Sequence, residues 1–128
     1  MCIFTYEALF LKNSIKIERL ENIIFIYLSG RCESYLANLI HEKRELFEKY
    51  LSEGCTDFVV DFKEVTHVSS TTLSVWIILK RLIEEKNGKI SFSSISEEFL
   101  KIFDFINIKS TIQTFNTVED AKIALISK

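Results

Sequence analysis

The chain has 128 residues, of which 48% are hydrophobic and 27% charged, which is the profile of one globular domain and not of a disordered or membrane protein. Sixteen basic and eighteen acidic side chains give a net charge of −2, so the broad basic field that collects nucleic acid or anionic lipid is absent. Cys2, Cys32 and Cys55 are too widely spaced for a metal motif or a disulfide framework. We therefore predict reduced thiols, no metal site and no cofactor.

The chain begins with an apolar segment, MCIFTYEALFL. This segment lacks a basic start and is interrupted by Glu7, so it fits neither a signal peptide nor a membrane span. We expect a cytoplasmic protein without direct membrane insertion. Residues 1–13 are predicted to form an extra edge strand or a loosely attached arm, and residues 14–128 to form one domain.

The first half of the domain reads as a hairpin followed by a helix. Two β-rich runs, Ile15–Leu20 and Ile23–Leu28, flank the turn Glu21-Asn22 and predict paired strands. Apolar residues then recur at helical spacing from Ser34 to Leu51, and Gly54 follows in the usual position after a helix.

Strands and helices alternate in the second half. Phe58–Phe62 is a short apolar run of strand length, and a helix is predicted from about Thr71 to Asn87-Gly88. The remaining elements are a strand at Ile90–Ser93, a helix capped by Ser96, a strand at Ile112–Phe115 and a last helix opened by Thr117 with Asp120 in the capping-box position. A hairpin followed by αβαβαβα predicts an α/β fold with a mixed sheet, parallel later strands and about four helices.

Four hydroxyl residues, Ser69, Ser70, Thr71 and Thr72, stand between the predicted strand and the helix that follows it. One of them is explained as an ordinary helix cap, which contributes about 1 kcal/mol. The others would lie at the positive end of the helix dipole, where an anion is favoured. The sequence therefore predicts a place where a phosphate is accepted or attached.

The same helix carries two apolar residues on its polar side. A helical wheel puts Leu73 and Ile77 opposite the core-facing arc, within two turns of Ser70. They suit a small docking patch for another protein, and packing beneath a neighbouring segment explains them equally well.

Catalytic constellations are mostly absent from the sequence. It contains no glycine-rich phosphate loop, no HExxH and no GxSxG, and its only histidines are His41 and His67. His41 lies on the polar face of a helix and is interpreted as solvated. His67 lies three residues before Ser70, but no carboxylate that would orient it is evident. These observations favour a binding surface over an active site.

From residue 15 to residue 126 the chain resembles the STAS domain, specifically the stand-alone bacterial anti-sigma-factor antagonists. The resemblance is carried by Leu28-Ser-Gly-Arg-Cys-Glu33, by Phe58-Val-Val-Asp-Phe62 and by the passage from Val65 through Thr72 to Leu73. The segment from Ser96 to Lys109 and the elements after it agree with the family in order and spacing.

The resemblance implies a regulatory module that binds an anti-sigma factor with serine kinase activity, with a serine phosphatase as a further partner. The family's loop motif is D-S-(S/T)-G-(L/I), and its first serine, the phosphorylated residue, falls on Ser70, with Ser69 and Thr71 as alternatives. This chain departs from the pattern at Ser69, Thr72 and Glu33, where the family has Asp, Gly and Asp. The partner-binding residues implied are Glu33, His67, Ser69, Ser70, Thr71, Thr72, Leu73 and Ile77.

Two other functions stay open on the sequence. The departures at Ser69 and Thr72 favour a STAS module that is never phosphorylated and serves as a subunit of a sensory or transporter complex. A small enzyme would instead use Ser70 with His67 or Asp61, and would keep its turnover without any partner protein.

Overall fold

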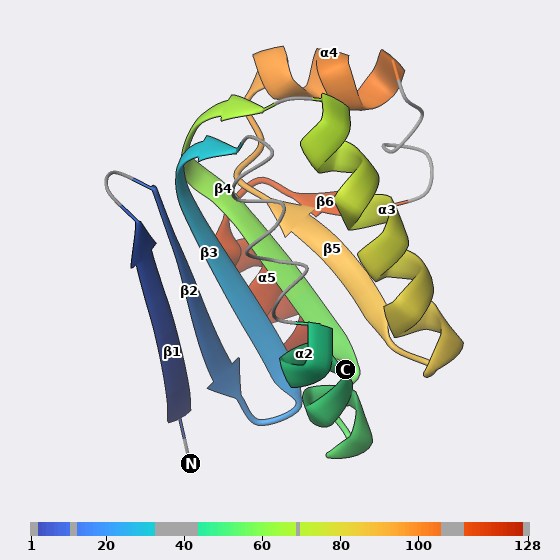
Figure 1. The fold of residues 1–128 in the computed structure, drawn as a ribbon. Helices are drawn as coiled ribbons and strands as arrows, with labels where there is room; N and C mark the ends of the chain where they lie inside the picture. Colours follow the sequence, from blue (N-terminus) through green and yellow to red (C-terminus); the bar gives the residue numbers. More distant parts are fainter. Residues whose placement is uncertain (1–2, 11–12, 33–43, 69, 106–111, 127–128) are drawn as a thin grey trace.

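The computed structural model describes residues 3–10, 13–32, 44–68, 70–105 and 112–126 (Figure 1). The strands are β1 (Ile3–Phe10), β2 (Asn13–Leu20), β3 (Ile23–Cys32), β4 (Asp57–Val68), β5 (Lys89–Ser93) and β6 (Gln113–Phe115). The helices are α2 (Arg44–Ser52), α3 (Ser70–Glu85), α4 (Glu97–Phe105) and α5 (Val118–Ile126). Within these residues, no helix is both long and apolar enough to cross a lipid bilayer.

The six strands form one sheet in the order β1-β2-β3-β4-β5-β6, so every strand lies beside its neighbours in the sequence. β1, β2 and β3 are antiparallel, whereas β3, β4, β5 and β6 run parallel to one another. Parallel neighbours need crossover connections, and α2, α3 and α4 lie within those connections. The predicted α/β fold with a mixed sheet is confirmed.

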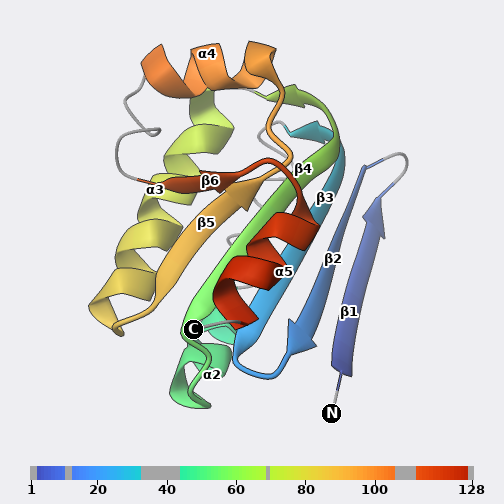
Figure 2. The ribbon, with the colours of Figure 1, turned by 180° about the vertical axis from the view of Figure 1, so that it is seen from behind.

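The hairpin at the start of the domain turns where the sequence predicts. Leu20 pairs with Ile23 across the two residues Glu21 and Asn22, and Glu21 has a φ of 55°. The segment before this hairpin forms β1, which pairs with β2 along its whole length and is the outermost strand in both views (Figures 1 and 2).

Helices cover the two faces of the sheet unequally. α2 and α3 lie over one face (Figure 1), and α5 lies over the other (Figure 2). Because side chains alternate along a strand, β3 supplies Ile24 and Ile26 to the main core and Ile23 and Phe25 to a smaller core beneath α5. A strand buried on both faces explains why residues 23–28 form an almost continuous apolar run.

Trp76 fixes α3 to the sheet. Its side chain is fully buried, and its ring packs edge-on against Phe62 of β4 and Phe92 of β5, with centroid distances of 6.2 and 6.1 Å. The rings of Phe62 and Phe92 are themselves 5.0 Å apart. This aromatic cluster holds the helix that begins at Ser70 on two adjacent strands.

Both predicted helix caps are present. The Ser96 hydroxyl accepts a hydrogen bond from the Phe99 amide at 3.2 Å, and the Thr117 hydroxyl accepts one from the Asp120 amide at 3.0 Å. These contacts satisfy amides that have no partner within their own helices, which is why α4 and α5 begin directly after the two hydroxyl residues.

β3 and β4 both continue beyond their predicted ends, β3 to Cys32 instead of Leu28. β4 extends for twelve residues to Val68, well beyond the predicted end at Phe62, because the prolonged β3 continues to pair with it. The helix predicted from Ser34 to Leu51 is described only as α2 from Arg44 onward. The part of that prediction that covers residues 34–43, including His41, lies outside the described residues.

Candidate functional site

The ends of β3 and β4 lie side by side at the carboxyl end of the parallel strands. After one local shift the register pairs Gly30 with Val65, and after a second it pairs Arg31 with His67 and Cys32 with Val68. Gly30 has a φ of 86°, a conformation that a residue with a Cβ rarely adopts, and it lies at one of the shifts. The fold thereby brings the Leu-Ser-Gly-Arg-Cys segment against the strand that leads into the hydroxyl residues.

α3 begins at Ser70, two residues after β4 ends. Ser70, Thr71, Thr72 and Leu73 therefore belong to the start of this helix, and its first turn contains no acidic residue. The partial positive charge of the helix N-terminus thus has no carboxylate of its own turn to offset it, which favours an added anion there. Glu33 and Ser69, which the sequence also assigns to this site, lie outside the described residues.

His67 is exposed near the end of β4, and its Nδ1 lies 3.0 Å from the hydroxyl oxygen of Thr66. Its backbone neighbour across the strands is Arg31, a residue that the sequence-based site does not include. The signal that would have found Arg31 is the register between the two strand ends, because Arg31 and His67 are distant in the sequence.

Among the α3 side chains that the structure describes, from Trp76 onward, the exposed apolar one is Ile78. Its side chain is 59% exposed, whereas Ile77 is partly buried and packs against the main core. The helical wheel placed Ile77 on the polar side, and its partial burial agrees with packing, one of the two explanations that the sequence left open. The side chain of Leu73 lies outside the described part of the chain. Ile78 therefore offers an apolar contact to a partner, about 12 Å along the helix from Ser70.

Asp61 faces away from the hydroxyl residues. Asp61 lies on the same face of β4 as Val59, which packs beneath α5. Phe62 lies on the opposite face, where it packs against Trp76 of α3. The carboxylate is 6% exposed and accepts a hydrogen bond from the Ser93 hydroxyl at 3.1 Å. This placement separates Asp61 from Ser70 by the thickness of the sheet, which removes the support for a Ser70–Asp61 catalytic pair.

A hollow of about 350 Å³ lies beside Asp61 at the start of α5, and Tyr27, Lys63, Glu119 and Lys122 are among the residues that line it. Burial is the main cause that raises the pKa of Tyr27 to about 12, with smaller contributions from the negative charges of Glu18, Asp61 and Glu119. The phenol therefore stays neutral in the folded protein at a pH where an unfolded chain would ionise it.

This shift predicts a loss of stability in strong alkali. Because the folded pKa of Tyr27 lies above the value of 10.0 for a free phenol, its contribution is complete below pH 10 and is lost as the pH rises towards 12. Urea unfolding at several pH values should show that Tyr27→Phe loses less stability than the wild type across this range. The same decline in both proteins would contradict the assignment.

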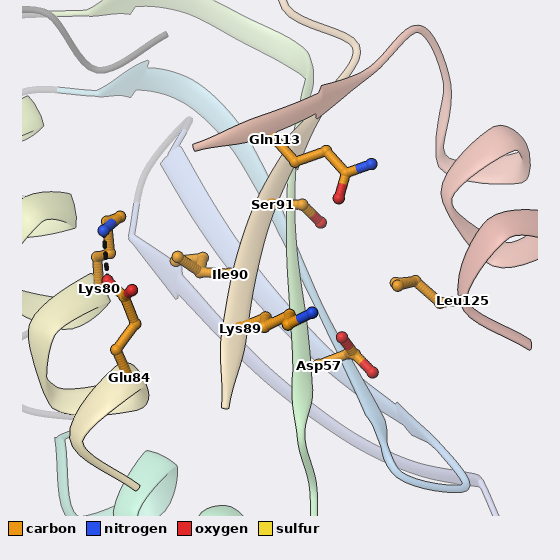
Figure 3. A pocket seen from close by; sticks show the side chains of 8 residues that line it. All are labelled: Asp57, Lys80, Glu84, Lys89, Ile90, Ser91, Gln113 and Leu125. Carbon is orange, nitrogen blue, oxygen red and sulfur yellow. Dashed lines mark hydrogen bonds and ion pairs between the residues drawn. The ribbon is translucent and has the colours of Figure 1, made fainter. Parts of the chain in front are cut away.

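A second hollow, of about 230 Å³, lies at the opposite end of the strands (Figure 3). Asp57 and Lys89, which line it, pair with each other as the first residues of β4 and β5. Figure 3 shows the ion pair of Lys80 and Glu84 on one side of β5 and Gln113 and Leu125 on the other. It is therefore a groove around the edge of β5, separate from the residues at the start of α3.

Comparison with known proteins agrees with the fold. The family model described as "STAS domain" matches residues 12–121. The anti-sigma-B factor antagonist of Bacillus subtilis (strain 168) is 24% identical over 99 residues, which cover 77% of this chain and 87% of that protein. Two solved structures of anti-sigma factor antagonists share the fold at low sequence identity.

The first is the anti-sigma factor antagonist SpoIIAA in its unphosphorylated form. It has a TM-score of 0.68 at 16% identity and covers 88% of this chain and 97% of its own. The second is an anti-sigma factor antagonist from Mycobacterium paratuberculosis, with a TM-score of 0.70 at 14% identity over 96% of this chain and 93% of its own.

Proposed function

Since the chain belongs to the STAS domain family, we propose that it is a cytoplasmic anti-sigma-factor antagonist that binds an anti-sigma factor with serine kinase activity. On this proposal the chain is a regulatory binding protein and not an enzyme. The partner carries the nucleotide and the catalytic groups, and this chain offers the acceptor hydroxyl and the surface around it.

The observation that carries the proposal is the register of Arg31 with His67 at the end of the two central strands. It brings the end of β3 beside the end of β4, which leads into the first turn of α3, and this supports one binding surface built from segments far apart in the sequence. Relatives named as anti-sigma-B factor antagonists are 24% identical to this chain over 99 residues.

Ser70 is the proposed acceptor, with Ser69 and Thr71 as neighbouring alternatives. In the reaction, the Ser70 hydroxyl oxygen bonds to the γ-phosphorus of the partner's ATP, ADP leaves, and the hydroxyl proton passes to a base on the kinase. The added charge of about −1.5 to −2 is tolerated at a helix N-terminus without acidic residues, but it disrupts a surface that meets acidic or apolar partner groups. Phosphorylation therefore releases the partner, and a serine phosphatase would restore binding.

The proposed binding surface includes Glu33, His67, the residues from Ser69 to Leu73, and the exposed side of α3. Ile77 belongs to it through the packing that supports the helix, and Ile78 provides the exposed apolar contact.

Replacing Ile78 by aspartate tests this surface. We expect Ile78→Asp to weaken partner binding about tenfold or more, since it removes an apolar contact and introduces a charge into the interface. Ile123→Asp is the matched control, because Ile123 is similarly exposed, at 67%, on α5 over the other face of the sheet. Isothermal titration of both variants measures the difference, and equal effects at the two positions would contradict the surface.

The second candidate function is an unphosphorylated STAS subunit of a sensory or transporter complex. The observation that favours it is the replacement of the family's Asp and Gly by Ser69 and Thr72. Thr72 adds a side chain in the first turn of α3, where a kinase would approach closely. On this alternative, binding partners would be the same whether or not Ser70 carries a hydroxyl.

Affinity capture from the cells that make the protein separates the two candidates. The proposal predicts recovery of an ATP-binding serine kinase that also binds a sigma factor. Recovery of only transporter or receptor subunits would support the alternative.

A further inference from the structure

β1 forms an edge of the sheet, and none of the described strands pairs with its outer side. Ile3 to Phe10 pair with β2 without any shift in register, and β1 stands at the end of the strand order. Neither view shows a described element beyond it (Figures 1 and 2). The opposite edge is different, because β6 contributes only the three residues Gln113–Phe115.

Long edge strands are normally protected against pairing with other chains by lysine, proline, bulges or short length. β1 reads Ile-Phe-Thr-Tyr-Glu-Ala-Leu-Phe. It contains no lysine, arginine or proline, its register is regular, and Glu7 is its one charged residue. β1 therefore lacks the features that normally protect an edge strand. The described part of the chain supplies it with a pairing strand on one side only.

We propose that β1 pairs antiparallel with β1 of a second copy of this chain, joining the two sheets into one continuous sheet. A second copy fits this edge because the charge pattern of β1 is compatible with pairing between two identical strands. A homodimer of this kind has a two-fold axis perpendicular to the sheet. Two residues that pair across the axis therefore belong to the same face of the joined sheet. Opposed positions then have residue numbers whose sum is even.

Among the registers that meet this condition, those centred on Tyr6 and on Glu7 pair the most residues of β1, and charge selects between these two. With Tyr6 on the axis, Thr5 lies opposite Glu7 of the second copy and Ile3 lies opposite Leu9, so no like charges meet. With Glu7 on the axis, the two carboxylates face each other directly, which is destabilising. The register centred on Tyr6 is therefore the one that the sequence of β1 supports.

The proposed dimer leaves the surface around Ser70 free. β2 and β3 separate β1 from β4 in the sheet, and α3 follows β4. Two copies would thus present two partner-binding surfaces, one on each half of the joined sheet. The dimer does not depend on the anti-sigma function, so either proposal can fail without the other.

Sedimentation equilibrium of the full chain tests the dimer, with charge variants at position 5. Thr5→Glu places a carboxylate opposite Glu7 twice per dimer and should raise the dissociation constant about tenfold, whereas Thr5→Lys should lower it by a similar factor. The double variant Thr5→Glu/Glu7→Lys reverses the pair and should restore association to at least the wild-type level. Circular dichroism checks that each variant is folded.

A wild-type chain that sediments as a monomer at every concentration would overturn the proposal. So would a dimer whose dissociation constant changes equally in Thr5→Glu and Thr5→Lys, because that result excludes the register. Failure of the double variant to recover association, while remaining folded, would likewise place the interface elsewhere.

Discussion

Replacing Ser70 by glutamate is expected to abolish binding of the anti-sigma factor, whereas Ser70→Ala should keep the binding and lose the phosphate. Glutamate mimics part of the phosphoryl charge at the first residue of α3. An unpaired or like charge buried in an interface costs several kcal/mol, which corresponds to a loss of affinity of roughly 100-fold or more. Titration of the purified partner with each variant measures this loss.

Ser52→Glu is the control for the added charge. Ser52 is an exposed serine at the end of α2, whereas α3 begins at the other end of the molecule (Figure 1). We expect its affinity to match the wild type. If Ser70→Glu, Ser70→Ala and Ser52→Glu bound the partner equally, Ser70 would have no switching role and the unphosphorylated-subunit alternative would be favoured.

The second large effect is expected at Trp76, where Trp76→Ala should lower the free energy of unfolding by about 3–5 kcal/mol. The side chain is fully buried and packs on Phe62 and Phe92, so truncation leaves a cavity between α3 and the sheet. Since a domain is stabilised by only about 5–15 kcal/mol, this one change removes a large share. Urea unfolding followed by circular dichroism measures it, because the variant lacks the only tryptophan.

Trp76→Phe provides the graded comparison. The indole Nε1 is buried without a hydrogen-bond partner among the described residues, so phenylalanine removes an unsatisfied donor while it fills most of the space. We expect Trp76→Phe to lose clearly less stability than Trp76→Ala and to keep partner binding. A loss below about 1 kcal/mol in Trp76→Ala would contradict the role of this residue in holding α3, since buried large-to-small changes normally cost more.

Most elements of the fold could be predicted because their signals are local. The turn at Glu21-Asn22, the caps at Ser96 and Thr117 and the apolar spacing of Trp76, Leu79 and Ile83 are each readable within one or two turns of chain. The mixed α/β sheet followed from the alternation of these elements and the need for crossovers between parallel strands.

The shape of the site could not be predicted because it depends on pairing between distant segments. The residues after Phe62 resemble a polar loop because Lys63, Glu64, Thr66 and His67 are polar. In the structure they continue β4 against the end of β3. Without that register, Arg31 gives no sign that it lies opposite His67.

A helical wheel also could not predict which apolar residue of α3 is exposed. An ideal wheel places Ile77 opposite the core, whereas in the structure Ile77 is partly buried and packs against the core. Ile78 is the apolar residue left exposed among the described side chains of α3. Similarly, a sequence alone could not decide between an arm and a strand for residues 1–13, since β1 forms through its pairing with β2.

The most direct test of the account is the intact mass of the protein isolated from the cells that make it, measured for the wild type and for Ser70→Ala. The account predicts that part of the wild-type protein carries the mass of one phosphoryl group, that phosphatase treatment removes this mass, and that Ser70→Ala never acquires it. A wild-type protein without the added mass while its partner kinase is active, or an added mass that persists in Ser70→Ala, would contradict the assignment of Ser70 as the switch.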